Sequence, residues 1–244
     1  MRLSLACLAA LFAISSAHAS AFIEPKLTIP PGTHHGPRVA LTFDACTGQA
    51  DERILSTLIS NRVPATIFVT ARWLAKNPAA IAELKAHPDL FEIENHGAKH
   101  LPAIDVPAKV YGIATAGSPE ALRAEISGGA SAVEKTFGVK PRWYRGATGL
   151  YNSSALALIQ SMGYRTAGYS VIGDGGAAFS TAVTEKHIAA AKDGDVIIAH
   201  VNQPKRPAGA GVVQGILALK ARGFRFVKLD DALGAEPPAP VLTH

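Results

Sequence analysis

The strongest constraint on the fold is the regular alternation of short apolar segments with amphipathic ones along most of the chain. Seven segments are rich in β-branched and aromatic residues, as buried strands are. These predicted strands are 38–45, 65–71, 91–95, 141–147, 165–171, 195–201 and 224–229. The helical patterns between them are 50–61, 78–87, 118–138, 152–163, 180–192 and 211–223. Strands that alternate with helices of this length form a parallel sheet, open or closed, and seven strands favour a barrel-like closure.

Capping residues support several of these helices. Ser118 precedes Pro119, an arrangement typical of a helix start. Glycines follow three of the helical patterns, at Gly138, Gly163 and Gly223. We therefore expect helices that end close to these positions.

The first residues have the pattern of a cleavable secretory signal. A basic residue, Arg2, precedes an apolar run that is too short to span a membrane, and a small-x-small end follows at Ala17 to Ala19. We predict a signal peptide over 1–19, an approach segment over 20–35, a single catalytic domain over 36–232 and a flexible tail over 233–244. The mature protein is then secreted or periplasmic, without an integral membrane span.

Composition narrows the class of protein. The 244 residues are 48% hydrophobic and only 18% charged, which is typical of a well-packed globular chain. The formal net charge is +5, but the basic residues are scattered singly, so we expect no nucleic-acid partner. Of the two cysteines, only Cys46 remains after signal removal, which precludes an intramolecular disulfide.

Polar residues gather where the predicted strands end, which is where parallel α/β folds place their chemistry. Any one of them alone has a structural interpretation, such as a helix cap, a buried histidine or an ion-pair partner. Their repeated occurrence at equivalent ends favours a site. The residues are Asp44, His96, His100, Arg145, Asp174 and His200. His96 and His100 could converge on one metal ion if the backbone makes a helical turn between them.

The order of these segments resembles the polysaccharide deacetylases of carbohydrate esterase family 4, the NodB-homology domain, over about residues 36–232. The matching segments are LTFDACTG, HGAKH, YRGATG, GYSVIGDGG and GDVIIAH. The resemblance implies a distorted (β/α) barrel of about seven parallel strands. It also implies metal-dependent hydrolysis of N-acetyl groups on a polysaccharide.

The resemblance assigns roles to individual residues. His96 and His100 would hold a divalent metal, which polarises the acetamide carbonyl and acidifies a water. Asp44 would accept the proton of that water, and His200 would donate one to the departing amine.

Four further residues would support them. By resemblance, Arg145 orients Asp44 through an ion pair, and Asp174 orients His200. The backbone N–H near Thr148 would help to hold the developing oxyanion. Asn202 lies in the loop after His200, and we expect it to contact substrate.

The first motif departs from the family pattern. Ala45 stands where the family has a second aspartate, which is the third metal ligand, and alanine cannot coordinate. Asp44 could move onto the metal, Cys46 could supply a thiolate, or waters could fill the gap. We favour Asp44 because its carboxylate lies at the strand end, and we interpret Cys46 as a small buried apolar residue. The expected metal is zinc.

The predicted function is removal of N-acetyl groups from N-acetylhexosamine residues of a cell-wall or extracellular polysaccharide, similar to peptidoglycan or chitin. A glycan-binding barrel that has lost turnover is one alternative, and an amidase acting on a small non-sugar amide is another. The presence of Asp44, Arg145 and His200 favours an active enzyme.

Overall fold

Among the residues that the structure describes, eight strands form the central sheet. The computed structural model describes residues 22–33 and 35–234, so the predicted signal segment and residues 235–244 of the predicted tail lie outside it. The strands are β1 (Arg38–Ala45), β2 (Ala65–Val69), β3 (Phe91–Asn95), β6 (Trp143–Tyr144), β7 (Arg165–Thr166), β8 (Val171–Ile172), β9 (Val196–His200) and β10 (Arg225–Val227). Their order is β7-β6-β3-β2-β1-β9-β8, with β10 also paired to β1. Each of these pairings is parallel.

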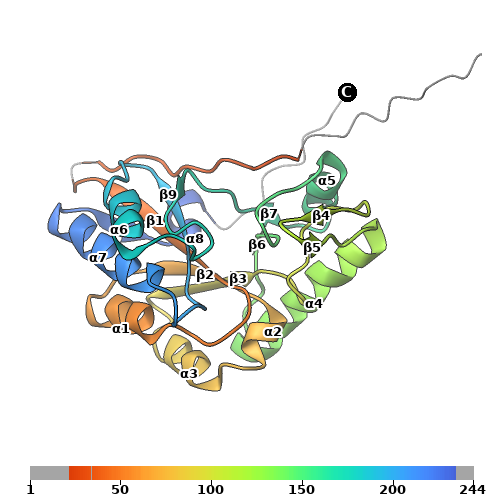
Figure 1. The fold of residues 1–244 in the computed structure, drawn as a ribbon, viewed down its shortest axis with the longest axis horizontal. Helices are drawn as coiled ribbons and strands as arrows, with labels where there is room; N and C mark the ends of the chain where they lie inside the picture. Colours follow the sequence, from red (N-terminus) through yellow and green to blue (C-terminus); the bar gives the residue numbers. More distant parts are fainter. Residues whose placement is uncertain (1–21, 34, 235–244) are drawn as a thin grey trace, which may run out of the picture.

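Helices lie along the outside of the curved sheet, with α1, α6 and α7 on one flank and α4 and α5 on the other (Figure 1). They are α1 (Glu52–Ser60), α2 (Ala71–Leu74), α3 (Pro78–Ala86), α4 (Pro119–Phe137), α5 (Ser153–Ser161), α6 (Thr181–Ala189), α7 (Ala208–Ala221) and α8 (Leu229–Leu233). Between β3 and α4 the chain forms a small antiparallel pair, β4 (Lys109–Val110) and β5 (Ile113–Ala114). Among the described residues, no helix combines the length and the apolar character that a membrane span requires.

The predicted helix signals are confirmed. The Ser118 hydroxyl accepts a hydrogen bond from the Ala121 backbone N–H at 3.1 Å, which caps α4. The same helix ends at Gly138, whose φ of 74° lies in the left-handed region that glycine favours.

The alternation of side chains along β1 separates two environments. Val39, Leu41, Phe43 and Ala45 are buried in the main core together with side chains of α1 and α7. Ala40 belongs instead to a second core on the other face of the sheet, which we call the inner face. Because successive side chains point to opposite faces, Asp44 shares the inner face with Ala40.

The predicted strand at 165–171 is wrong, and the reason explains how the sheet closes into a barrel. Residues 165–171 are not one strand: β7 and β8 occupy the two ends of the strand order, and residues 167–170 cross between them. Local sequence suits a strand here, but the carbonyls of Ala167 and Gly168 accept hydrogen bonds from a buried arginine, Arg145. The short crossing brings the sheet edges together, which confirms the distorted (β/α) barrel.

Candidate active site

The carboxylate of Asp44 forms a buried ion pair at the carboxyl end of β1. Asp44 is 4% exposed and Arg145 is fully buried, and Arg145 Nη1 donates to Asp44 Oδ1 at 2.9 Å. The Arg145 guanidinium also stacks on the Phe68 ring, 4.3 Å from its centroid. Burial opposes ionisation of Asp44, but the charges of His96 and Arg145 hold its pKa below the ordinary value. Asp44 is therefore a fixed anion at neutral pH.

His96 presents one ring nitrogen to this carboxylate. Its Nδ1 lies 2.6 Å from the Arg145 backbone oxygen, and since a carbonyl can only accept, Nδ1 carries a proton. Nε2 lies 3.6 Å from Asp44 Oδ2 and 3.4 Å from Cys46 Sγ. Burial opposes protonation, but the charges of Asp44 and Cys46 raise the pKa of His96 to about 8. In the neutral ring the lone pair of Nε2 points into the site, as in a metal ligand.

The loop after β3 brings His100 to His96. The two ring centroids are 5.0 Å apart, so the predicted convergence is observed. The connecting backbone is not a helical turn, because Gly97 and His100 both have positive φ, 87° and 63°. The carboxylate of Glu125 in α4 fixes this loop by accepting from the backbone N–H groups of Lys99 and Leu101.

Cys46 completes a compact group with the two histidines. Its Sγ and one nitrogen of each ring all lie within 4.8 Å of one another. The Cys46 backbone oxygen accepts from the Thr70 hydroxyl, which fixes the chain beyond the strand. Burial would raise the pKa of the thiol, but the charge of His96 and hydrogen bonds with the neighbouring imidazoles hold it well below its ordinary value. A thiolate and two imidazoles form a donor set that suits zinc.

His200 ends β9 opposite Asp44, with which it is in register. Asp174 accepts from both the ring and the backbone of His200: Nδ1 lies 2.9 Å from Oδ1, and the N–H lies 2.6 Å from Oδ2. This pair fixes the ring, so that Nε2 is the nitrogen left for substrate. Burial opposes protonation, but the charge of Asp174 raises the pKa of His200 well above its ordinary value.

The two residues expected to contact substrate differ in their surroundings. Thr148 has a φ of 71°, which is strained for a β-branched residue, and its buried Oγ1 has no hydrogen-bond partner among the described residues. Such strain is often found at functional sites. Asn202 is 1% exposed and its amide donates to the Thr47 backbone oxygen, so it supports the β1–α1 loop. Its role as a substrate contact remains a prediction.

The structure thus brings together, at one end of the sheet, what we call the histidine cluster: Asp44, Cys46, His96, His100 and His200. The positions of Arg145 and Asp174 match their expected contacts. Sequence reasoning gave no role to Glu125, which lies in an ordinary amphipathic helix. The sequence analysis interpreted Cys46 as a buried apolar residue, although its spacing of two residues from Asp44 places both side chains on the same face of the strand.

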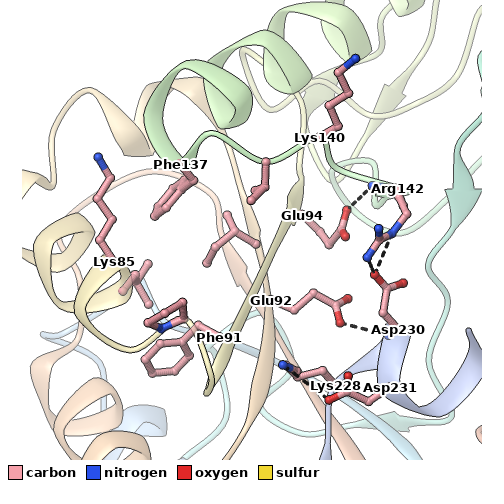
Figure 2. A pocket seen from close by; sticks show the side chains of 14 residues that line it. Lys85, Phe91, Glu92, Glu94, Phe137, Lys140, Arg142, Lys228, Asp230 and Asp231 are labelled. Carbon is pink, nitrogen blue, oxygen red and sulfur yellow. Dashed lines mark hydrogen bonds and ion pairs between the residues drawn. The ribbon is translucent and has the colours of Figure 1, made fainter. Parts of the chain in front are cut away.

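A second group of ionisable side chains lines a cavity of about 550 Å³ beside β3, whose wall also includes Phe91, Ile93 and Phe137 of the main core. This carboxylate cluster consists of Glu92, Glu94 and Asp230. Figure 2 shows the three carboxylates on one side of the cavity and the ring of Phe137 on the other. Glu94 Oε2 accepts from the backbone N–H groups of Arg142 and Trp143. Burial is the largest cause that raises the pKa of Glu94 to about 9 and that of Glu92 to about 7.

Comparison with known proteins identifies the family. The sequence model of the family described as polysaccharide deacetylase matches residues 32–167. The chain belongs to the polysaccharide deacetylase family. Members of this family generally use a divalent metal and hydrolyse N-acetyl groups on polysaccharides. Among curated proteins, none matches the chain significantly.

Solved structures share the fold of this polysaccharide deacetylase family member at low identity. A peptidoglycan N-acetylglucosamine deacetylase aligns with a TM-score of 0.67 and 21% identity, covering 88% of this chain and 94% of its own. A deacetylase solved with substrate has a TM-score of 0.64 and 24% identity, covering 82% and 92%. A carbohydrate esterase family 4 pseudoenzyme from Bacillus anthracis has a TM-score of 0.64 and 20% identity, covering 83% and 67%. The fold therefore hosts both active and inactive members.

Proposed function

We propose that this protein is an exported, metal-dependent hydrolase that removes N-acetyl groups from N-acetylhexosamine residues of a cell-wall or extracellular polysaccharide. The observation that carries the proposal is the pairing at the site. Asp44 is bound to Arg145 and His200 to Asp174, on adjacent strands in register. A buried base and a partly buried acid are thereby held at neighbouring strand ends, at the same end of the sheet as the two converging imidazoles.

Asp44 acts as the general base. Hydrolysis of an acetamide needs a water that loses a proton as it attacks the carbonyl carbon. Arg145 binds Oδ1, so Oδ2 is the oxygen that receives this proton. The lowered pKa of Asp44 keeps it ionised and ready at neutral pH.

His200 acts as the general acid. The departing amine must be protonated, and the raised pKa of His200 keeps a proton on its ring at neutral pH. Because Asp174 accepts from Nδ1, the proton available to the leaving group is the one at Nε2. The backbone N–H near Thr148 supports the oxyanion.

His96 and His100 would hold a divalent metal, which we propose is zinc. When bound, it polarises the acetamide carbonyl and lowers the pKa of a water. His96 donates its Nδ1 proton to a backbone carbonyl, which fixes the tautomer that such binding requires.

Export is the part of the proposal that depends on the N-terminal sequence. The basic residue, apolar run and small-x-small end of residues 1–19 support a secretory signal. A polymer outside the cytoplasmic membrane is the substrate class that such a location makes accessible.

Acetate release tests the activity. Purified protein is incubated with chitin oligosaccharides or peptidoglycan after chelation, with and without added zinc. We expect release that falls on chelation and returns with zinc. Binding of glycan without release would support the non-catalytic alternative, and release from small amides alone would support the amidase. Full activity after complete metal removal would refute the metal-dependent mechanism.

A further inference from the structure

We propose that the Cys46 thiolate is the third protein ligand of the metal and takes the place of the carboxylate that is absent at Ala45. The inference rests on the proposed metal-dependent function and specifies the composition of its centre. It assigns a cysteine-and-two-histidine site with an open position, a donor set that favours zinc over hard cations such as Mg²⁺.

The alternation of β1 places the thiol in the site. Ala45 is fully buried in the core between the sheet and the helices, so its side chain faces away from the histidines. Cys46 follows on the inner face, two residues after Asp44, and its Sγ reaches His96. The chain thus supplies a donor atom one residue later than the family pattern does.

The distances fit tetrahedral zinc. With a Zn–S bond of about 2.3 Å, a Zn–N bond of about 2.0 to 2.1 Å and a tetrahedral angle, sulfur and nitrogen lie about 3.5 Å apart. The observed distance from Cys46 Sγ to His96 Nε2 is 3.4 Å. One nitrogen of His100 lies within 4.8 Å of Cys46 Sγ and of a ring nitrogen of His96, so the three potential donors already form a compact triangle.

All three donors have supporting contacts. The Thr70 hydroxyl donates to the Cys46 backbone oxygen, and His96 donates its Nδ1 proton to the Arg145 backbone oxygen. Glu125 holds the loop that carries His100. Contacts of this kind hold the donor groups in place, as outer-shell contacts do in metal sites.

Asp44, the ligand favoured from sequence, is less suited to the role. Arg145 Nη1 already binds its Oδ1, and the compact group of potential ligand atoms contains no carboxylate. With Cys46 as ligand, Asp44 remains free to act as the base. The two assignments therefore predict opposite effects of substitution.

Cobalt(II) spectroscopy of the full mature chain, stripped of metal and titrated with Co²⁺, distinguishes them. A thiolate ligand gives an intense near-ultraviolet sulfur-to-cobalt charge-transfer band, and Cys46 is the only cysteine after position 7. We expect this band at one cobalt per chain. Cys46→Ser should abolish it and weaken zinc binding by more than about tenfold, since a whole ligand is lost. The matched variant Asp44→Asn should retain both the band and the metal content.

Alkylation of the wild-type thiol gives a second readout that needs no variant. Bound zinc should slow the reaction of Cys46 with iodoacetamide, and chelation should restore it. Stoichiometric cobalt without the band, equal alkylation with and without zinc, or metal loss in Asp44→Asn but not in Cys46→Ser would overturn the inference. A band without acetate release would refute only the proposed function. Metal-dependent release without the band would refute only the thiolate ligand.

Discussion

The histidine cluster and the carboxylate cluster are both largely buried and both lie on the inner face of the sheet, and each includes a side chain from β3 or from the residue directly after it. Glu92 and Glu94 belong to one, and His96, two residues further along the same face, belongs to the other. Burial opposes ionisation in both. They differ in the charge of their neighbours: Asp44 faces His96 and Arg145, whereas Glu94 faces Glu92 and Asp230.

The difference teaches how to interpret a shifted pKa. In the histidine cluster, opposite charges preserve an ionised base and a protonated acid side by side, which is the condition for proton transfer at neutral pH. In the carboxylate cluster, burial is the largest cause that raises the pKa of Glu94 to about 9, and the negative charges of Glu92 and Asp230 add to it, so Glu94 is neutral at pH 7. Its Oε2 accepts from the backbone N–H groups that begin β6, so its function is structural. A perturbed pKa alone does not locate the active site.

The largest expected effect contrasts one carboxylate from each cluster. Asp44→Asn should lower the kcat of acetate release by about 10²- to 10⁴-fold, the usual contribution of a general base. Glu92→Gln should change it less than about twofold. Both variants are assayed with metal content and circular dichroism as controls. Equal activity of the two variants would remove the functional distinction between the clusters.

The next effect concerns Arg145, the cation that pairs with Asp44 of the histidine cluster. Arg145→Met should lower the free energy of unfolding by about 3 to 5 kcal/mol, because it leaves the Asp44 carboxylate buried without its partner. Urea denaturation measures this change. The double variant with Asp44→Asn should recover part of the loss. No recovery would mean that Arg145 acts through its stacking and its contacts with residues 167–168 instead.

The pH dependence of stability tests whether Glu94 of the carboxylate cluster is protonated in the folded protein. The pKa of Glu94 is about 9 in the folded protein and about 4.5 when unfolded, so between these values the folded state binds a proton that the unfolded state has lost. Stability therefore falls as pH rises, by at most about 1.4 kcal/mol per pH unit. Glu94→Gln should reduce this slope.

Melting temperatures between pH 5 and 6.5 provide the measurement. Glu92, with a pKa raised to about 7, contributes a slope of the same sign, so Glu94→Gln should flatten the dependence without abolishing it. The amide oxygen of glutamine can still accept from the Arg142 and Trp143 N–H groups. An unchanged slope would show that Glu94 is ionised in the folded protein.

Sequence patterns predicted the layered α/β fold because local and tertiary preferences agree over most of the chain. The strands at 38–45 and 91–95 were predicted to the residue. The segment 165–171 was not, because its split into β7 and β8 depends on the closure of the barrel and on the contacts of Arg145 with residues 167–168.

The site was predictable where chemistry coincides with a strand end, as for Asp44 and His200. The site was harder to predict where a residue's role depends on a contact with a distant part of the chain. Glu125 is one acidic residue in an amphipathic helix, and only the packing of α4 places it beneath the loop of His100. The thiol of Cys46 resembles an ordinary buried side chain until His96, fifty residues away, is seen beside it.

The smallest expected effect concerns Arg142, the cation that pairs with Asp230 of the carboxylate cluster. Arg142 binds Asp230 through Nε at 2.8 Å, but its side chain is 49% exposed, so water screens the pair. Arg142→Met should lower the free energy of unfolding by about 1 kcal/mol or less. Asp230 keeps the hydrogen bond from Trp143 Nε1, which limits the loss further. Urea denaturation at low and high salt should show the difference from wild type shrinking as ionic strength rises. A loss as large as that of Arg145→Met would mean that the carboxylate cluster carries more negative charge than a protonated Glu94 allows.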